Sequence, residues 1–261
     1  MPDPIIVAPT GPPGPTVALV HGAFADSSGW AGVVELLMAA GIPVQAVSNP
    51  LRGIAADTAY VASALAQIPG PVLAVGHSYG GAIITNAAVG AGNVVGLVYV
   101  SAFAPDEGEV LLEIENGSTD SVLNTALVQL QYPNGPGGDP IAEFSIAADK
   151  FHDVFAADLP REQAAIMAAT QRPVSSLGFV EKNGPPAWKT LPSWAVVSTG
   201  DKAAGTDVVR SMAQRAGATI TEAEGSHVLF VARPQVVVDV IMAALGALAR
   251  TAAGSATTAA P

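Results

Sequence analysis

One stretch decides the fold: Val72-Leu73-Ala74-Val75-Gly76-His77-Ser78-Tyr79-Gly80-Gly81-Ala82-Ile83-Ile84. A short apolar run leads into the pattern Gly-x-Ser-x-Gly, and an alanine-rich helical pattern follows. A strand before and a helix after are the flanks of a nucleophile elbow, which would hold Ser78 on a strained turn with its Oγ exposed. Gly76 and Gly80 would allow the close backbone approach that such a turn needs. The alternative is a glycine-rich turn with an idle serine, so the chain must also supply a base and an orienting acid.

The composition predicts a folded α/β protein with a large core. The chain has 261 residues, of which 50% are hydrophobic and 13% are charged, and this length suits one large domain. The net charge of -11 disfavours nucleic acid and anionic membranes as partners, and we expect a solvated acidic surface. The absence of cysteine excludes disulfides, a thiol nucleophile and thiolate metal sites.

Nothing in the sequence predicts targeting or membrane insertion. Met1-Pro2-Asp3-Pro4 lacks the basic and apolar regions of a secretory signal. The longest apolar segment, residues 236–249, contains Asp239 and Gly246 and resembles a helix with one buried face more than a membrane span. We therefore expect a soluble, cytoplasmic monomer or homodimer that acts on a small molecule.

Strand-like and helix-like segments alternate through most of the chain. Residues 1–15 form a proline-rich lead-in with an edge strand at 5–7. Apolar runs predict strands at 16–20, 43–47, 94–100, 194–198 and 218–222 besides the elbow strand, and helical patterns cover 30–40, 54–67, 206–216 and 234–249 besides the elbow helix. This alternation, with near-continuous apolar strands, predicts a doubly wound, mostly parallel sheet.

The alternation stops between residues 105 and 192. Helical patterns at 120–131 and 160–169 flank a turn-rich segment at 134–140, which predicts a helical cap inserted over the carboxyl edge of the sheet. A second domain is the alternative, but little strand or core pattern supports it. The predicted organisation is a core of residues 1–104 and 193–250, a helical cap at 105–192, and a flexible low-complexity tail at 251–261.

The base should be a histidine at the carboxyl end of a strand. His227 follows the last predicted strand and precedes the final helix, as the chain order Ser, Asp, His requires. We expect His21 to support the loop after the first strand and His77 to point away from the serine. His152 lies in the cap, either on the surface or against the substrate.

Two aspartates follow strands between the serine and the base. Asp201 comes after a buried strand through Thr199-Gly200, and Asp106 comes after an earlier one. We favour Asp201, because the preceding glycine permits a tight turn and Asp106 begins the insertion. The acid would hold the imidazole in the correct tautomer and stabilise its protonated form.

An oxyanion hole needs two backbone N–H groups directed at the developing charge. One should come from Tyr79, the residue after the nucleophile. The other should come from the loop His21-Gly22-Ala23, with Ala23 as the donor and Gly22 allowing close approach.

The chain resembles the α/β-hydrolase superfamily from residue 16 to residue 249. Within it, the chain is most similar to plant-type methylesterases and hydroxynitrile lyases and their bacterial esterase relatives. The matching stretches are Leu19-Val20-His21-Gly22-Ala23, Gly76-His77-Ser78-Tyr79-Gly80-Gly81, Gly200-Asp201-Lys202 and Gly225-Ser226-His227, with softer matches at Leu159-Pro160-Arg161-Glu162 and Gln171-Arg172-Pro173. The resemblance implies no cofactor and a small helical cap over a mostly apolar pocket.

Three positions separate this chain from other branches that it resembles. The lyases carry threonine in place of Gly22 and lysine in place of Val228, so nothing obvious would hold a departing cyanide. Epoxide hydrolases and haloalkane dehalogenases carry aspartate in place of Ser78. The sequence thus predicts a serine hydrolase that cleaves a small carboxylic ester through an acyl-enzyme. The alternatives are hydroxynitrile lyase-like C–C cleavage and a non-catalytic small-molecule binder. Aromatic side chains expected to line the pocket are Phe24, Phe103, Phe151 and Phe155.

Overall fold

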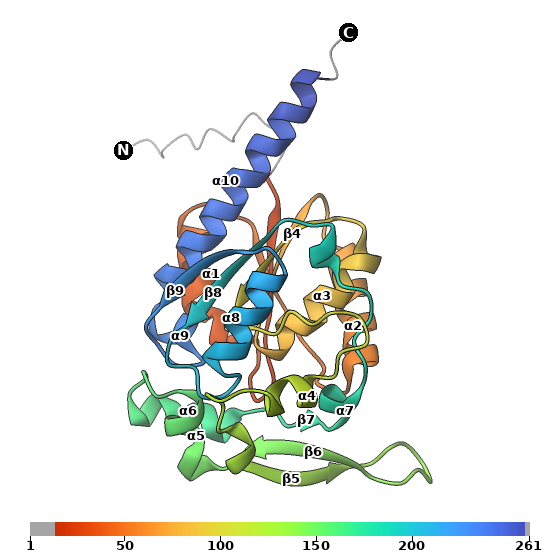
Figure 1. Ribbon diagram of the computed structural model, residues 1–261, viewed down its shortest axis with the longest axis vertical. Helices are drawn as coiled ribbons and strands as arrows, with labels where there is room; N and C mark the ends of the chain where they lie inside the picture. The colour runs from red at the N-terminus through yellow and green to blue at the C-terminus, as the bar shows by residue number, and fades with distance from the viewer. Residues whose placement is uncertain (1–13, 259–261) are drawn as a thin grey trace, which may run out of the picture.

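The core of the protein is one six-stranded parallel β-sheet (Figure 1). The structure, a computed structural model, describes residues 14–258 and the side chains of residues 14–254. In spatial order the strands are β2 (Val44–Val47), β1 (Thr16–Val20), β3 (Val72–His77), β4 (Val94–Val100), β8 (Ser193–Ser198) and β9 (Thr219–Ala223). All neighbouring strands are parallel. The strand order reverses between β1 and β3, which is where open α/β sheets bind ligands.

Helices cover both faces of this sheet. Helix α1 (Ala31–Ala39) packs against α10 (Pro234–Thr258), and α2 (Ile54–Ala66) packs against α3 (Tyr79–Ala91). The two pairs lie on opposite sides of the sheet (Figure 1). Strands covered on both faces must be apolar at nearly every position, and β3 is buried throughout its length. The predicted doubly wound α/β fold is confirmed.

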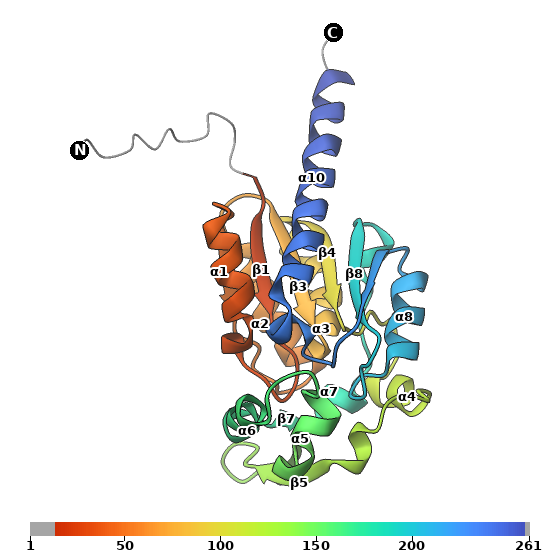
Figure 2. The ribbon, with the colours of Figure 1, turned by 90° about the vertical axis from the view of Figure 1, so that its left-hand side faces the viewer.

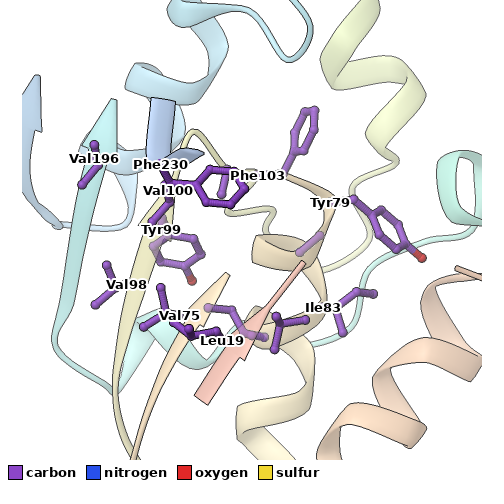
Figure 3. Packing of buried hydrophobic residues seen from close by; sticks show 14 of the residues in the cluster. Leu19, Val75, Tyr79, Ile83, Val98, Tyr99, Val100, Phe103, Val196 and Phe230 are labelled. Carbon is purple, nitrogen blue, oxygen red and sulfur yellow. The ribbon is translucent and has the colours of Figure 1, made fainter. Parts of the chain in front are cut away.

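The hydrophobic core surrounds the elbow. Leu19, Val75, Val98 and Val196 from four neighbouring strands are all fully buried, and Ile83 of α3 packs with them (Figure 3). The first ten residues of α3 are buried, although most surface helices bury only one stripe. The turn between β3 and α3 is therefore held between two well-packed elements.

The cap lies beyond the carboxyl ends of the strands, at the end of the molecule opposite the last turns of α10 (Figures 1 and 2). The sequence predicted a helical cap, but the observed cap contains strands as well as helices. Its elements are α4 (Leu111–Asn116), η2 (Leu123–Thr125), β5 (Leu127–Tyr132), β6 (Ile141–Ile146), α5 (Ala148–Phe155), α6 (Arg161–Thr170), β7 (Val174–Ser175), α7 (Leu177–Val180) and η3 (Ala187–Lys189).

The prediction of a helix at residues 120–131 is wrong. Strands β5 and β6 form an antiparallel hairpin, and β7 extends it to three strands. The run Leu127-Val128-Gln129-Leu130-Gln131-Tyr132 fits a strand once β6 supplies the cross-strand partners, and such pairing overrides weak helix propensity. The turn-rich segment at 134–140 is a loop, as predicted, but it connects two strands.

Most core elements lie within two residues of their predicted bounds, but the C-terminal helix is longer. Helix α10 continues through Thr258, where the sequence predicted a flexible tail from residue 251. The added segment contains three alanines between residues 252 and 256, and alanine has the highest helix propensity. The edge strand predicted at residues 5–7 lies outside the described residues. The remaining core helices are η1 (Ser27–Trp30), α8 (Thr206–Arg215) and α9 (Leu229–Ala232).

Helix α10 is also a longer apolar segment than the one the sequence analysis gave, residues 236–249. Residues Pro234–Gly254 have a mean hydropathy of 1.8 and meet the length and composition test for a membrane span. The core helix of a soluble protein passes the same test, so the finding is weak support for membrane insertion. About 28% of the residues in this apolar window are buried within the molecule.

Two glycines of α3 provide a matched test of the elbow packing. A Cβ on Gly80 would lie 2.5 Å from the Val20 carbonyl oxygen and 2.7 Å from that of His21, whereas a Cβ on Gly90 would meet nothing within 4 Å. We expect Gly80→Ala to lower the free energy of unfolding by about 2 kcal/mol or more, because backbone atoms must shift. Gly90→Ala should raise it by about 0.5–1 kcal/mol through helix propensity. Urea denaturation of both variants tests this, and equal effects would contradict the packing argument.

Candidate active site

Ser78 occupies the strained turn between β3 and α3. Its backbone has φ 53° and ψ −125°, a conformation that non-glycine residues rarely adopt. Hydrogen bonds hold the turn: Ser78 N–H donates to the Val100 carbonyl at 3.3 Å, and Phe103 N–H donates to the Ser78 carbonyl at 3.2 Å. A Cβ on Gly76 would lie 2.6 Å from the Gly80 oxygen. The backbone therefore has the elbow conformation that the sequence predicts.

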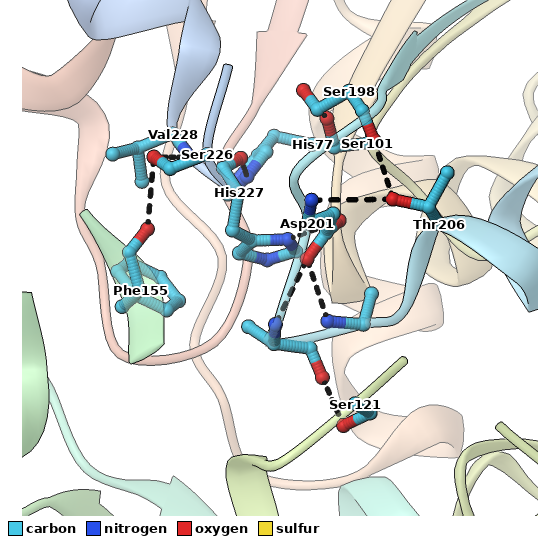
Figure 4. Close-up of polar contacts among 12 residues, drawn as sticks. His77, Ser101, Ser121, Phe155, Ser198, Asp201, Thr206, Ser226, His227 and Val228 are labelled. Carbon is cyan, nitrogen blue, oxygen red and sulfur yellow. Dashed lines mark hydrogen bonds and ion pairs between the residues drawn. The ribbon is translucent and has the colours of Figure 1, made fainter. Parts of the chain in front are cut away.

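His227 and Asp201 form a buried hydrogen-bonded pair. His227 Nδ1 lies 2.8 Å from Asp201 Oδ2, and both side chains are 1% exposed (Figure 4). The other carboxylate oxygen of Asp201 accepts hydrogen bonds from the backbone N–H groups of Ala203 (2.9 Å) and Ala204 (3.0 Å). The carboxylate is thus held at both of its oxygens. Because Oδ2 can only accept a hydrogen bond, it places the proton of neutral His227 on Nδ1. Nε2 is left free to accept a proton.

Asp106, the other aspartate considered, does not contact His227. Its Oδ1 lies 2.5 Å from Lys189 Nζ, and its side chain is 32% exposed. The hydrogen bond from Lys189 lowers the pKa of Asp106. The structure therefore brings Asp201, and not Asp106, to the histidine.

His21 fastens the loop after β1 to the segment after β2. Its Nε2 accepts a hydrogen bond from Asn49 N–H at 2.9 Å, which leaves Nδ1–H to donate to the Gly22 carbonyl at 3.0 Å. Burial lowers the pKa of His21, so the ring is neutral and both bonds persist. This agrees with the supporting role predicted for it.

His77 links the elbow strand to the loop that carries the base. Its Nε2–H donates to the His227 carbonyl at 2.9 Å, and the two rings lie 4.7 Å apart. Burial lowers the pKa of His77 well below its usual value, so the ring stays neutral. The fourth histidine, His152, is partly exposed and lies away from the other three, with Nε2 3.1 Å from the Leu159 carbonyl oxygen and Nδ1 2.7 Å from Asp153 Oδ1.

Ser78 and His227 line one small, mostly apolar cavity of about 10 Å³ under the cap. Its lining comprises Ala23, Phe24, Ser78, Tyr79, Phe103, Leu111, Glu115, Leu123, Phe155, Phe179, Ala203, Ala204 and His227. Phe151, which was expected there, is fully buried behind Phe155, with ring centroids 5.0 Å apart. Among the described residues, no hydrogen bond joins Ser78 Oγ to His227 and no cluster of three or more His, Asp or Glu side chains suits a metal ion.

The two amides proposed from the sequence flank this cavity. Ala23 and Tyr79 both line it, and a Cβ on Gly22 would lie 2.7 Å from Ser78 Cβ, so the loop after β1 lies directly against the serine. Phe24, the next residue in that loop, has φ 59°. In the part of the chain that the structure describes, neither the Ala23 nor the Tyr79 N–H donates a hydrogen bond to the protein. Both donors are available to a ligand oxygen.

Two functional side chains were missed by the sequence analysis. Asp158 of the cap accepts hydrogen bonds from the Ser226 N–H at 2.8 Å and from the Ser226 hydroxyl, which ties the cap to the residue before His227. Glu115 of α4 is 4% exposed and lines the cavity. The only sequence signal for Glu115 is its position four residues after the buried Leu111, on the same helix face.

Burial raises the pKa of Glu115 from 4.5 to about 7. The Ser121 hydroxyl and His227 act against this rise, and the negative charge of Asp201 adds to it. The desolvation cost dominates because a buried carboxylate without a cation is unfavourable.

The raised pKa predicts a pH-dependent stability term. Between pH 4.5 and 7 the folded protein holds a proton that the unfolded chain has lost, so stability should fall as pH rises through this window. Glu115→Gln removes the term. We expect the difference in the free energy of unfolding, Glu115→Gln minus wild type, to increase by up to about 3 kcal/mol between pH 4 and pH 8, in favour of the variant. Urea denaturation at both pH values measures this, and a pH-independent difference would contradict it.

A family model, described as the alpha/beta hydrolase family, matches residues 17–240. No curated protein sequence matches the chain. Among solved structures, polyneuridine aldehyde esterase is similar with a TM-score of 0.72 at 20% identity, over 87% of this chain and 97% of that one. A pyrethroid hydrolase from Sphingobium faniae is similar with a TM-score of 0.72 at 22% identity, over 90% and 99% of the two chains.

A methylesterase from Arabidopsis is also similar, with a TM-score of 0.70 at 18% identity, over 89% of this chain and 99% of that one. These structures include the plant esterase group that the sequence motifs resemble, and at such identities they show a shared fold. The family model covers most of the chain. The chain belongs to the alpha/beta hydrolase family.

Proposed function

We propose that the protein is a serine esterase that hydrolyses a small carboxylic ester through an acyl-enzyme intermediate. One observation carries the proposal: His227, hydrogen-bonded to the buried Asp201, borders the same cavity as Ser78 on its strained turn. A nucleophile, a base and a third group that orients the base are the parts that acyl transfer requires. The missing Ser78–His227 hydrogen bond is compatible with this role, because such bonds often form only with substrate present.

In the proposed mechanism Ser78 Oγ attacks the ester carbonyl while His227 Nε2 accepts its proton. Asp201 stabilises the imidazolium and holds its Nδ1–H in place. The Ala23 and Tyr79 amides donate to the oxyanion of the tetrahedral intermediate. His227 then protonates the departing alkoxide, and a water molecule activated by the same ring hydrolyses the acyl-enzyme. The sequence of steps needs no metal or cofactor.

The cavity supports a small, largely uncharged ester as the substrate. Most of its lining is apolar, with Phe24, Phe103 and Phe155 among the largest side chains. Structurally similar proteins are named as an esterase, a methylesterase and a pyrethroid hydrolase, which supports ester chemistry without identifying the substrate.

Lyase chemistry is the less favoured alternative. Val228 stands where the resembled lyases carry lysine, and it is fully buried and apolar, so it offers no cation to a departing cyanide. Gly22 stands where they carry threonine, and even a Cβ there would lie 2.7 Å from Ser78 Cβ. A non-catalytic binder would not require the His227–Asp201 pair.

Ser78→Ala should abolish ester hydrolysis and leave the fold intact. We expect kcat for p-nitrophenyl acetate to fall by a factor on the order of 10³ or more, because only the oxyanion donors and binding would remain. A fluorophosphonate probe should label the wild type and not the variant. The exposed Ser63→Ala variant is the control and should keep both properties. Retained activity in folded Ser78→Ala would refute the proposal.

Asp201→Asn and Asp106→Asn form a matched pair. Asp201→Asn should lower kcat by roughly 10²–10⁴, because an amide at this position favours the wrong His227 tautomer. Asp106→Asn should change kcat less than about threefold, since a partly exposed ion pair contributes little. Steady-state kinetics on one ester compare them. The reverse ranking would assign the orienting role to Asp106.

A further inference from the structure

Glu115 is the one acidic side chain in the lining of the catalytic cavity. It is 4% exposed and forms no ion pair with any described residue. The proposed hydrolysis does not use it. A buried carboxyl without a cationic partner destabilises the folded protein. The presence of Glu115 at this position therefore needs an explanation.

The hydrogen-bonding capacity of Glu115 is almost unused. Its single contact is with Ser121, whose Oγ lies 3.4 Å from Glu115 Oε1. The same Oγ lies only 2.6 Å from the Ala203 carbonyl oxygen. A hydroxyl has one hydrogen to donate, and the shorter bond takes it. Ser121 Oγ can then act towards Glu115 only as an acceptor at the long distance of 3.4 Å, and Glu115 Oε2 has no hydrogen bond to a described residue, so this oxygen can bond to a group in the cavity.

Glu115 stands between two cavities. Glu115 and Phe179 line both the catalytic cavity and a larger one of about 310 Å³, which Leu127 of β5 and Phe144 of β6 also line. The remaining lining of the larger cavity is Leu112, Asn124, Ser176 and Val180. The catalytic cavity is narrow, and a substrate chain that extends past Glu115 would enter this second space.

The carboxyl is a hydrogen-bond donor below about pH 7, where it is protonated. The titratable groups around it are few: Asp201 and His227 act on it through space, and Tyr79 is the other titratable residue in the lining. The Tyr79 hydroxyl donates to Asp57 at 2.9 Å, and burial raises the pKa of Tyr79 well above its usual value. No lysine or arginine lines either cavity to hold Glu115 ionised.

We propose that Glu115 is a specificity-determining residue that donates a hydrogen bond to an uncharged oxygen acceptor, such as an ether or ketone oxygen, in the substrate chain that enters the second cavity. The preferred substrates are then oxygenated esters, in which the acceptor lies a few bonds from the scissile carbonyl. Selectivity follows because an all-carbon chain leaves the buried carboxyl unpaired. This inference rests on the proposed esterase function.

The test compares p-nitrophenyl hexanoate with three analogues in which an ether oxygen replaces the methylene at carbon 3, 4 or 5. Each kcat/KM is divided by the rate constant for hydroxide hydrolysis of the same ester. This division removes the effect of the ether oxygen on the intrinsic reactivity of the ester carbonyl. Pentyl acetate and its ether analogues, followed by pH-stat, give the same comparison for the alcohol side. The preference is the ratio of kcat/KM for the ether ester to that for the carbon ester, in which pH effects common to both esters cancel.

For the wild type we expect a preference of about 3- to 10-fold for one oxygen position at pH 6, the usual range for a single hydrogen bond. It should disappear at pH 8.5, where Glu115 is ionised and can no longer donate. Glu115→Gln should keep the preference at both pH values, because an amide donates at any pH. Glu115→Leu should show none at either pH.

Glu113→Gln is the matched control. Glu113 lies on the same helix, α4, but is exposed, so its substitution should leave both the preference and its pH dependence unchanged. A preference that survives in Glu115→Leu, or no preference at any oxygen position, would overturn this inference while hydrolysis by Ser78 stands. Failure of Ser78 to cleave any of these esters would overturn the esterase proposal and this inference together.

Discussion

Close backbone packing around Ser78 is the constraint on which the rest of the structure depends. The serine can hold φ 53° only because the segments around it approach closer than side chains would allow. The helix after the turn contacts the end of β1 at Gly80, and the loop after β1 contacts Ser78 at Gly22. The strain is local, but the support comes from β1, β3, β4 and α3 together, which is how folded proteins keep such conformations.

The elbow also positions His227, the proposed base, through His77. A strand residue beside the nucleophile donates to the His227 carbonyl, 150 residues away in the chain. Since burial keeps His77 neutral, this bond does not depend on the protonation of the ring in the ordinary pH range. At the His227 ring, Asp201 is the partner, and two backbone amides hold the carboxylate oxygen of Asp201 that does not contact His227. The base is thus fixed by its carbonyl and by its ring.

The cap contributes chemistry as well as cover. Asp158 binds the Ser226 backbone and hydroxyl, so a movement of the cap would be transmitted to the residue next to the base. Glu115 places a carboxyl whose pKa is raised by burial in a mostly apolar cavity. Both residues are acidic, and both lie in the cap segment, whose sequence lacks the strand–helix alternation of the core. The hydrolase core is suited to general acyl transfer, and the cap is the natural source of selectivity.

The sequence by itself determined the parallel sheet, the elbow at Ser78 and the placing of His227 after the last strand, because each depends on local periodicity and on chain order. Only the tertiary structure decided between Asp201 and Asp106, since both follow strands and only distance to His227 separates them. It also decided the β5–β6 hairpin, whose strands need each other to be stable. The burial of Phe151 and the place of Glu115 between two cavities followed from the packing of the cap. Contacts between residues far apart in the chain leave no periodic signal in either partner, so only the folded arrangement reveals them.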